Sequence, residues 1–144
     1  MADPQDDVPA ELFARLSGDP LAAHLGISVD EIRPGYARAS MTVTGTHLNS
    51  VGTAHGGATM ALLDVVHAAV SNSHGTVAVA QDVHTEFLDA GRPGRHPAAE
   101  GIEIHRSSRT AVYRIEARAQ DGRLVATALA RVFRTGRPWS EVPA

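Results

Sequence analysis

The segment from Leu48 to Val70, LNSVGTAHGGATMALLDVVHAAV, constrains the fold more than any other part of the chain. It passes from a glycine-broken loop into an almost wholly apolar stretch that begins at Ala58. This pattern predicts a helix that starts at the loop and is covered by other elements on all sides. Because the stretch is shorter than the roughly 20 residues of a membrane span and is interrupted by Asp64 and His67, we expect a buried central helix and no span.

Composition narrows the class of protein. The chain has 144 residues, 43% of them hydrophobic, which suits one domain with one sizeable core. A formal net charge of -3 with scattered acidic groups argues against nucleic acid as a partner. The absence of cysteine excludes disulfides, thiolate-bound zinc and a cysteine nucleophile. The first residues lack the basic and apolar regions of a secretory signal, so a cytoplasmic protein is the default expectation.

Before the central helix we expect a short helix and two strands. Residues 1–8 read as a loose leader, and PAELFARLSG reads as a helix that Gly18, Asp19 and Pro20 terminate. The segment LAAHLGISVDEI leads towards a first strand. A second strand is predicted over 35–43, where apolar and polar side chains alternate.

After the central helix we expect four more strands. In TVAVAQDVHTEFL the apolar side chains Val77, Val79, Val83 and Phe87 share one face. AAEGIEIHR and TAVYRIEARA alternate, whereas RLVATALARVF is apolar on both faces, as a strand buried on both sides would be. The Asp121-Gly122 pair between the last two strands is a strong hairpin signal, and RPWSEVPA reads as a polar tail.

This order of elements predicts an α+β fold in which a curved antiparallel sheet wraps around the long helix. Such a sheet has open edges, and pairing them in a homodimer would remove their exposure. We expect a leader with a short helix over 1–20, one domain over 21–136, and a tail over 137–144.

The glycine-rich loop before the helix offers backbone donors. Gly52, Gly56 and Gly57 permit a close approach of other atoms to the backbone. The first N–H groups of a helix lack partners within the helix, so they can receive a carboxylate, a phosphate or a developing oxyanion. An ordinary turn with a glycine-rich cap is the alternative.

Asp64 lies about two turns into the helix, away from the end where a carboxylate is routine. Burying it costs free energy unless it is paired. His67, three residues later, could share its face and make a purely structural pair. The other interpretation is a desolvated carboxylate that faces a pocket and acts as a base or nucleophile.

Asn49, Gly52, HGG at 55–57 and Asp64 within ALLDVV together resemble the signature of hot-dog fold acyl-CoA thioesterases, in particular the PaaI (phenylacetate-degradation) subfamily. The resemblance extends roughly over residues 21–134, and the combined pattern N-x-x-G-x-x-H-G-G-x(6)-D is specific. It implies a long helix wrapped by an antiparallel sheet, a dimer paired edge to edge that often doubles to a tetramer, and an active site at the dimer interface.

The resemblance also implies the reaction, which is hydrolysis of an aryl- or arylacetyl-CoA, such as phenylacetyl-CoA, to free acid and CoA. Gly57, with neighbouring Gly56, would offer backbone N–H to the thioester oxygen, while Asn49 would position water or substrate and His55 would shape the loop. Asp64 of the other subunit would act as a general base, or attack the thioester to form an anhydride.

Two further expectations concern positions outside the loop. Some relatives carry a Ser or Thr helper on the strand after the helix, at a position that holds Ala80 here, which leaves Thr76 or Thr85 for that role. No resident cofactor is expected, but the phosphates of coenzyme A need basic groups. The candidates for binding these phosphates are Arg106, Ser107, Ser108 and Arg109. Arg92 and Arg95 are basic too, but we interpret them rather as part of a solvated loop.

Two other functions remain possible from the sequence, and a metal site is set aside. A hot-dog hydratase or dehydratase would use His55 with Asp64, and a non-catalytic hot-dog module would bind acyl-CoA without cleaving it. A metal site is set aside because none of the eight histidines forms an H-x(3)-H pair or a compact cluster with carboxylates.

Overall fold

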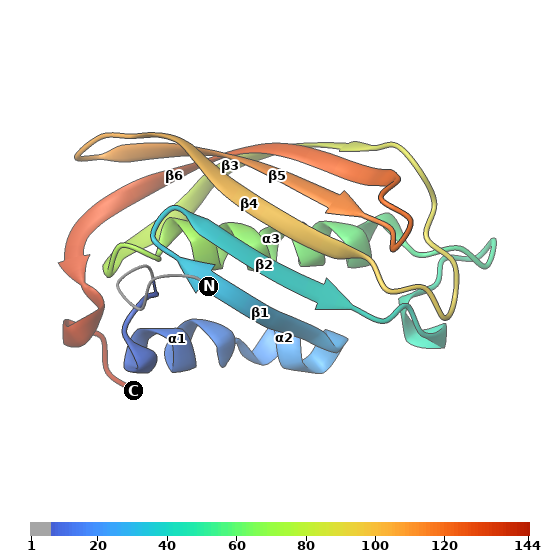
Figure 1. The fold of residues 1–144 in the computed structure, drawn as a ribbon, viewed down its shortest axis with the longest axis horizontal. Coiled ribbons are helices and arrows are strands. Elements are labelled where there is room, and N and C mark those ends of the chain that lie inside the picture. Colours follow the sequence, from blue (N-terminus) through green and yellow to red (C-terminus); the bar gives the residue numbers. More distant parts are fainter. Residues whose placement is uncertain (1–6) are drawn as a thin grey trace.

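The computed structural model describes residues 7–144, so most of the expected leader lies outside the described residues. A six-stranded antiparallel sheet with the strand order β1-β2-β4-β5-β6-β3 curls over one long helix, α3 (Figure 1). The predicted hot-dog fold is therefore confirmed. The elements are α1 (Ala10–Ser17), α2 (Pro20–Leu25), β1 (Ile27–Arg33), β2 (Tyr36–Met41), η1 (Gly45–His47), α3 (Gly56–Ser71), β3 (Thr76–Phe87), β4 (Ala98–Arg106), β5 (Thr110–Arg118), β6 (Leu124–Pro138) and η2 (Trp139–Glu141).

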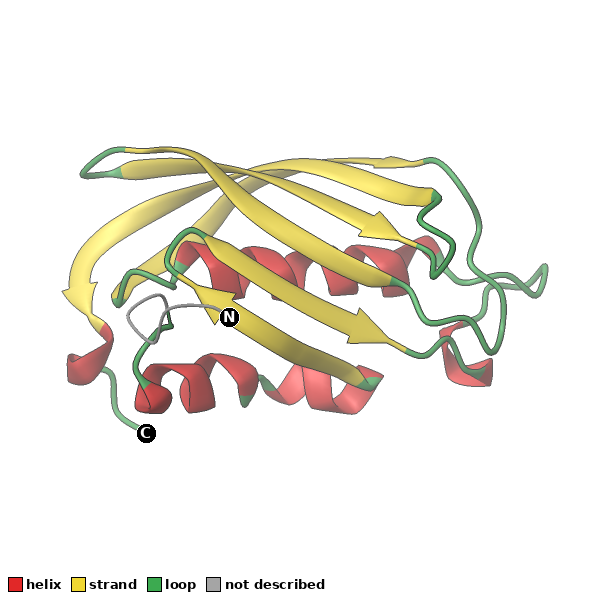
Figure 2. Ribbon diagram, viewed as in Figure 1, coloured by secondary structure: helices red, strands yellow, loops and turns green. Residues whose placement is uncertain are grey.

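The second short helix, α2, differs from the sequence-based expectation. The pattern indicates the approach to a strand over residues 21–25, but they form a helix whose start is capped by Asp19. The Asp19 carboxylate accepts a hydrogen bond from the backbone N–H of Ala22 at 3.0 Å, and Pro20 occupies the first helical position, where its missing N–H is harmless. Gly26 ends the helix at φ +70°, and α1 and α2 then lie beside β1 (Figure 2).

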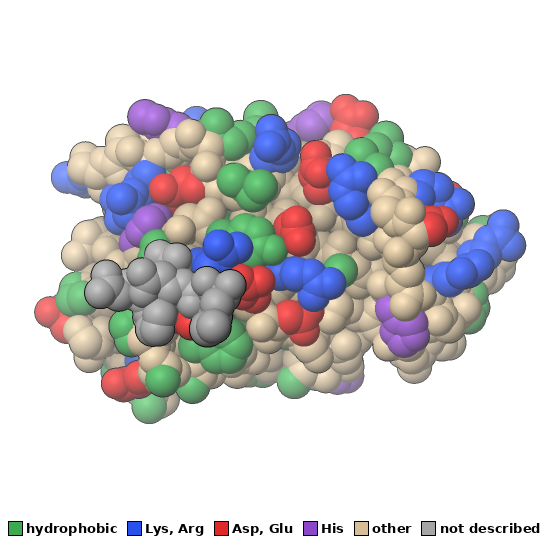
Figure 3. All heavy atoms as spheres, in the orientation of Figure 1, with side chains coloured by type: hydrophobic (Ala, Val, Ile, Leu, Met, Phe, Trp, Pro, Cys, Tyr) green, Lys and Arg blue, Asp and Glu red, His purple; other side chains and the backbone are tan. Residues whose placement is uncertain are grey.

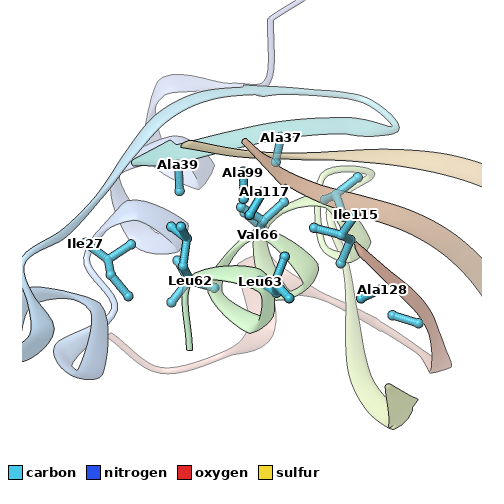
Figure 4. Close-up of a cluster of buried hydrophobic side chains, with 14 of the residues drawn as sticks. Ile27, Ala37, Ala39, Leu62, Leu63, Val66, Ala99, Ile115, Ala117 and Ala128 are labelled. Carbon is cyan, nitrogen blue, oxygen red and sulfur yellow. The ribbon is translucent and has the colours of Figure 1, made fainter. Parts of the chain in front are cut away.

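The core lies between α3 and the inner face of the sheet. Leu62, Leu63 and Val66 of the helix are fully buried there (Figure 4). The sheet meets them mainly with small side chains, which let the helix approach closely. At the closest point a Cβ on Gly101 would lie only 2.7 Å from Cγ1 of Val66. The small buried residues of the sheet in this contact include Ala37, Ala39, Ala99 and Ala117.

The side chains that point into the core agree with the alternation of the sequence in β5 but not in β3. Tyr113 and Ile115 of β5 point into the core, as their alternation with charged residues predicts. The side chains expected to share an apolar face of β3 do not enter the core, since Val79 and Phe87 are 50% and 55% exposed whereas Ala78 is buried. β3 is an edge strand, and its pairing with β6 shifts register twice, so no face of it is covered along its full length.

The outer face of the sheet carries apolar side chains that the pattern did not locate. β6 was expected to be buried on both sides, yet Leu129 is 52% exposed while its neighbours in sequence, Ala128 and Ala130, are buried. Ile102 and Ile104 of β4 are also exposed. One face of each strand is left to solvent because all the helices lie on the other side of the sheet (Figure 2).

The C-terminal segment is attached to the body of the protein. β6 continues to Pro138, beyond the start of the expected tail, and Trp139 follows in η2. The indole N–H of Trp139 donates to Oδ1 of Asn72 at 2.8 Å, just after the end of α3. Arg15 of α1 donates to the carbonyl of Val142 at 2.7 Å, so the two ends of the described chain are held together.

Candidate active site

The start of α3 leaves one backbone donor open. His55 is the N-cap residue, and its Nδ1 accepts a hydrogen bond from the backbone N–H of Gly57 at 2.8 Å. The backbone N–H groups of Ala58 and Thr59 both donate to the carbonyl of His55, at 2.9 and 3.2 Å. Within the described residues, the N–H of Gly56 is the one in this first turn that has no hydrogen-bond partner.

The two glycines differ in whether their backbone N–H groups are open to another acceptor. The sequence pattern favoured Gly57 as the main donor to a substrate oxygen, but the His55 imidazole occupies its N–H. A side chain accepting from the second or third helical N–H is the usual way in which a helix start is capped. The N–H of Gly56 remains open because the His55 imidazole accepts the hydrogen bond of Gly57 instead.

The open N–H lies at a cleft of about 290 Å³ beside the helix start. Asn49, Gly56, Thr59 and Phe87 are among its lining residues. The Phe87 ring stands close to Gly56, since a Cβ on that glycine would lie 3.5 Å from Cζ of Phe87. Sequence reasoning did not place Phe87 at this cleft, because alternation in β3 only grouped the ring with Val77, Val79 and Val83 on one face of the strand.

Asn49 holds the loop in shape. Its Oδ1 accepts from the backbone N–H groups of Val51 and Thr53, both at 3.1 Å, and its Nδ2 donates to Oγ1 of Thr53 at 2.9 Å. Asparagine commonly stabilises turns through such local bonds. The side chain therefore lines the cleft while its polar atoms are engaged within the loop.

Asp64 lies on the same face of α3 as Gly56. Gly56, Met60 and Asp64 are spaced four residues apart, so they follow one another along the helix. This face runs beside the edge strand β3, because Oγ1 of Thr85 donates to Sδ of Met60 at 3.1 Å. Of the two threonines considered as helpers, Thr85 thus lies beside this face, whereas Thr76 pairs with Pro138 at the other end of β3.

The carboxylate of Asp64 is not buried in the single chain, contrary to the expectation of a helix covered on all sides. Its side chain is 56% exposed, because none of the elements within residues 7–144 covers Asp64 on the helix face that runs along the edge strand β3. Nδ1 of His67 lies 3.7 Å from Oδ1 of Asp64, so the predicted pairing partner is present, although the distance exceeds that of a hydrogen bond.

The turn proposed for phosphate binding lies at the opposite end of the helix. Arg106, Ser107, Ser108 and Arg109 join β4 to β5. Arg106 is 3.7 Å from Glu103, and Glu103 pairs at 2.9 Å with His74, which follows the end of α3. Within one protomer this turn is therefore remote from the His55 end of the helix (Figure 1).

Other arginines lie nearer to the cleft. Arg92 and Arg95, together with Arg123, line a smaller cavity of about 110 Å³ that shares Ala54 and Thr59 with the cleft. Arg123 is paired with Asp89 at 2.6 Å. The two arginines that the sequence favoured as part of a solvated loop are thus closer to the helix start than those in the β4–β5 turn.

The outer face of the sheet carries charged side chains of both signs. Basic and acidic side chains are interspersed across it (Figure 3). Arg38 pairs with Asp30 at 2.9 Å, and Arg118 pairs with Glu116 at 2.8 Å. These arginines already have anionic partners, which makes this face a weaker candidate for phosphate binding.

Neither a metal site nor a membrane span is found in the described part of the chain. Among residues 7–144, no three His, Asp or Glu side chains gather closely enough to hold a metal ion. None of the helices over the same residues combines the length and the apolar character that crossing a membrane requires.

Comparison with known proteins identifies the family. Residues 51–126 match the family model described as the thioesterase superfamily. The chain is 34% identical over 123 residues to the acyl-coenzyme A thioesterase PaaI of Escherichia coli, covering 85% of this chain and 88% of that protein. The solved structure of E. coli PaaI, from the phenylacetic acid degradation operon, matches with a TM-score of 0.84 at 33% identity, covering 88% and 91% of the two chains.

Two further solved structures agree with this result. A variant of the phenylacetic acid degradation protein PaaI from Thermus thermophilus is 38% identical, with a TM-score of 0.78 and coverage of 81% of this chain and 99% of that one. A hypothetical thioesterase from Streptococcus pneumoniae, determined with coenzyme A, is 28% identical, with a TM-score of 0.74 and coverage of 78% and 90%. The chain belongs to the thioesterase superfamily, as a thioester hydrolase of the PaaI type with the hot-dog fold.

Proposed function

We propose that this thioesterase hydrolyses acyl-CoA thioesters with aryl or arylacetyl acyl groups, of the phenylacetyl-CoA type, to free acid and CoA. Two relatives are described in terms of phenylacetic acid degradation, and a third was determined with coenzyme A, which supports this choice of substrate. The observation that carries the proposal is the unpaired N–H of Gly56 at a cleft beside the Phe87 ring. An aromatic side chain there suits an aromatic acyl group.

The first role is stabilisation of the oxyanion. As a nucleophile attacks the thioester carbon, negative charge develops on the carbonyl oxygen, and a fixed backbone N–H at a helix start stabilises that charge. Gly56 supplies this N–H. Gly57 can contribute only where the His55 imidazole releases its N–H.

The second role belongs to Asp64. Its carboxylate either takes a proton from the attacking water or attacks the carbonyl carbon itself to give an anhydride that water then opens. In both routes the carbon–sulfur bond breaks and coenzyme A leaves as the thiolate, which is then protonated.

The two roles require two protomers. Gly56 and Asp64 are eight residues apart, which is about 12 Å along a helix axis. A donor at the carbonyl oxygen and a base at the carbon must each lie within about 3 Å of the reacting atoms. One chain therefore cannot bring both groups to one thioester.

The open edge of β3 supports a way to bring them together. An exposed edge strand of 12 residues presents unpaired backbone groups. Two-fold pairing along β3 would run the two α3 helices antiparallel and set Asp64 of one protomer towards Gly56 of the other. The same pairing would carry the turn with Arg106 and Arg109 towards the cleft of the second protomer, where its guanidinium groups would hold CoA phosphates. A homodimer, doubled to a tetramer as the family resemblance implies, is the proposed assembly.

A substrate panel tests the acyl preference. Phenylacetyl-, benzoyl- and straight-chain acyl-CoAs are compared by following release of free thiol from native protein and from Asp64→Asn. We expect the highest kcat/KM with an aromatic acyl group and almost complete loss of turnover in the variant. A higher kcat/KM with straight chains would refute the acyl assignment, and full activity of Asp64→Asn would refute the catalytic one.

Gly56→Pro tests the oxyanion donor. The substitution removes the N–H in question, adds a ring on the side of Phe87, and suits the first position of a helix. His55 at φ −62° and ψ 138° already has the backbone that a following proline favours. Gly56→Ala, which keeps the N–H, is the matched control. Loss of one such donor typically lowers kcat by about 10²–10³, and equal activity of the two variants would contradict the role.

Mixed dimers test the composite site. Gly56→Pro and Asp64→Asn are co-expressed with different tags and the mixed dimers are isolated. If each site combines the two protomers, one site of every mixed dimer is native and the other lacks both groups. The mixed dimer then recovers about half of the native activity per dimer. A mixed dimer as inactive as its parents would place both groups in the same chain.

A further inference from the structure

His67 is a buried polar side chain that the proposed reaction does not yet use. It is 1% exposed, and its ring packs against that of Tyr113 with 5.8 Å between the ring centroids. Its Nε2 is buried and has no hydrogen-bond partner among residues 7–144. Its Nδ1 lies 3.7 Å from Oδ1 of the Asp64 carboxylate.

These surroundings select one form of the imidazole. In a neutral histidine one ring nitrogen carries the proton and the other presents a lone pair. A proton on Nδ1 faces the Asp64 carboxylate favourably, whereas a lone pair there would be repelled by it. A proton on Nε2 would be a buried donor without an acceptor, which is costlier than a bare lone pair. Of the two tautomers, the one with the proton on Nδ1 therefore fits this site.

We propose that His67 is a positioning residue that holds the Asp64 carboxylate in its reactive orientation through the Nδ1 proton. The inference rests on the proposed catalytic role of Asp64. The imidazole itself is held by the core, between α3 and Tyr113 of β5, so it offers a fixed point to a side chain that is otherwise 56% exposed. Within residues 7–144 the Asp64 carboxylate makes no other ion pair or hydrogen bond.

The 3.7 Å separation agrees with this role. Hydrogen bonds of catalytic groups are often long in the unliganded protein and shorten when substrate is bound. Because His67 follows Asp64 by three residues, the two side chains occupy neighbouring positions on the helix, and the positioning role requires the carboxylate to approach Nδ1 more closely than 3.7 Å. The orientation of the carboxylate matters for the reaction rate, since a misplacement of a reacting group by about 1 Å can lower the rate roughly 100-fold.

The test compares His67→Asn with His67→Leu. Asparagine and leucine have the same branching at Cγ, so the two variants fill the site alike, and the asparagine Nδ2 takes the place of the histidine Nδ1. We expect His67→Leu to lower kcat by about tenfold or more with KM nearly unchanged, and His67→Asn to recover most of that loss. Thermal unfolding is measured for both, and assays are run below both transitions. If His67→Leu does not fold, His67→Phe replaces it, because a ring can still pack against Tyr113.

The same changes in the Asp64→Asn background separate this inference from the proposed function. If His67 acts through Asp64, His67→Leu lowers the residual rate of Asp64→Asn no further. Equal kcat values for His67→Asn and His67→Leu, or an undiminished effect of His67→Leu in the Asp64→Asn background, would overturn the positioning role while leaving the catalytic role of Asp64 intact. A fully active Asp64→Asn would instead overturn the proposed function on which this role depends.

Discussion

An alanine at position 101 would press the sheet against the central helix. Gly101 lies in β4, which faces α3, and a Cβ there would stand 2.7 Å from Cγ1 of Val66 and 3.2 Å from Cγ1 of Val70. Both valines are fully buried, so neither has free space into which to move. Overpacking of this kind typically costs about 1–3 kcal/mol of unfolding free energy. In a domain of this size each kcal/mol lowers the melting temperature by about 4 °C.

A second substitution checks the cause. Val66→Ala alone leaves a cavity and costs about 1–3 kcal/mol. In the double variant Gly101→Ala/Val66→Ala, the new methyl group occupies space that the valine has vacated. The double variant should therefore be more stable than the sum of the two single effects predicts, by about 1 kcal/mol or more.

Urea unfolding provides the measurement. Trp139 is the one tryptophan of the chain and its indole is bonded to Asn72 just after the end of α3, so its fluorescence reports the unfolding of this part of the protein. All variants are compared at one protein concentration, because assembly contributes to apparent stability. A Gly101→Ala variant with the native urea midpoint, or strictly additive effects in the double variant, would refute the close contact between β4 and the helix.

Three further predictions follow from local contacts. His55→Ala removes the acceptor of the Gly57 N–H and should lower stability by about 1 kcal/mol, measured by urea unfolding. Burial, followed by the nearby Glu103 carboxylate, raises the pKa of the Tyr113 hydroxyl above its usual 10. The unfolded chain then loses this proton first, so stability should fall above about pH 10 by up to about 1.4 kcal/mol per pH unit. Tyr113→Phe should flatten that slope in urea titrations between pH 9 and 11, and an unchanged slope would contradict the assignment. Asp19→Ala should cost about 1 kcal/mol through loss of the α2 cap, whereas Asp19→Asn should retain most of it in thermal unfolding.

Much of the fold could be predicted from local patterns. The apolar run after HGG predicted α3, alternation predicted the inward face of β5 with Tyr113 and Ile115, and Asp121-Gly122 predicted the last hairpin, where Gly122 has φ +87°. Each of these features depends on residues close together in sequence, through helical or strand periodicity and turn geometry. The spacing of Asn49, HGG and Asp64 likewise indicated the family from residues within one short segment of the chain.

Predictions of burial failed where a side chain is covered, or left exposed, by residues far away in the sequence. Periodicity shows that β3 has an apolar side, but not that β3 is an edge strand on which Val79 and Phe87 remain exposed. It places Asp64 on a helix face, but whether that face is covered depends on which strand the chain lays beside it. Register and strand order join residues far apart in sequence, so local pattern carries little information about them.

Local sequence patterns account for the central helix, the strands and the chemical types of the candidate site residues. Which of these groups are open to a ligand depends on the folded chain. His55 occupies the N–H of Gly57 and leaves that of Gly56 open, and the unpaired edge of β3 leaves Asp64 exposed about 12 Å away along the helix. Residue type sets which reactions a group can take part in, whereas its availability depends on the hydrogen bonds and contacts that it already makes in the folded chain.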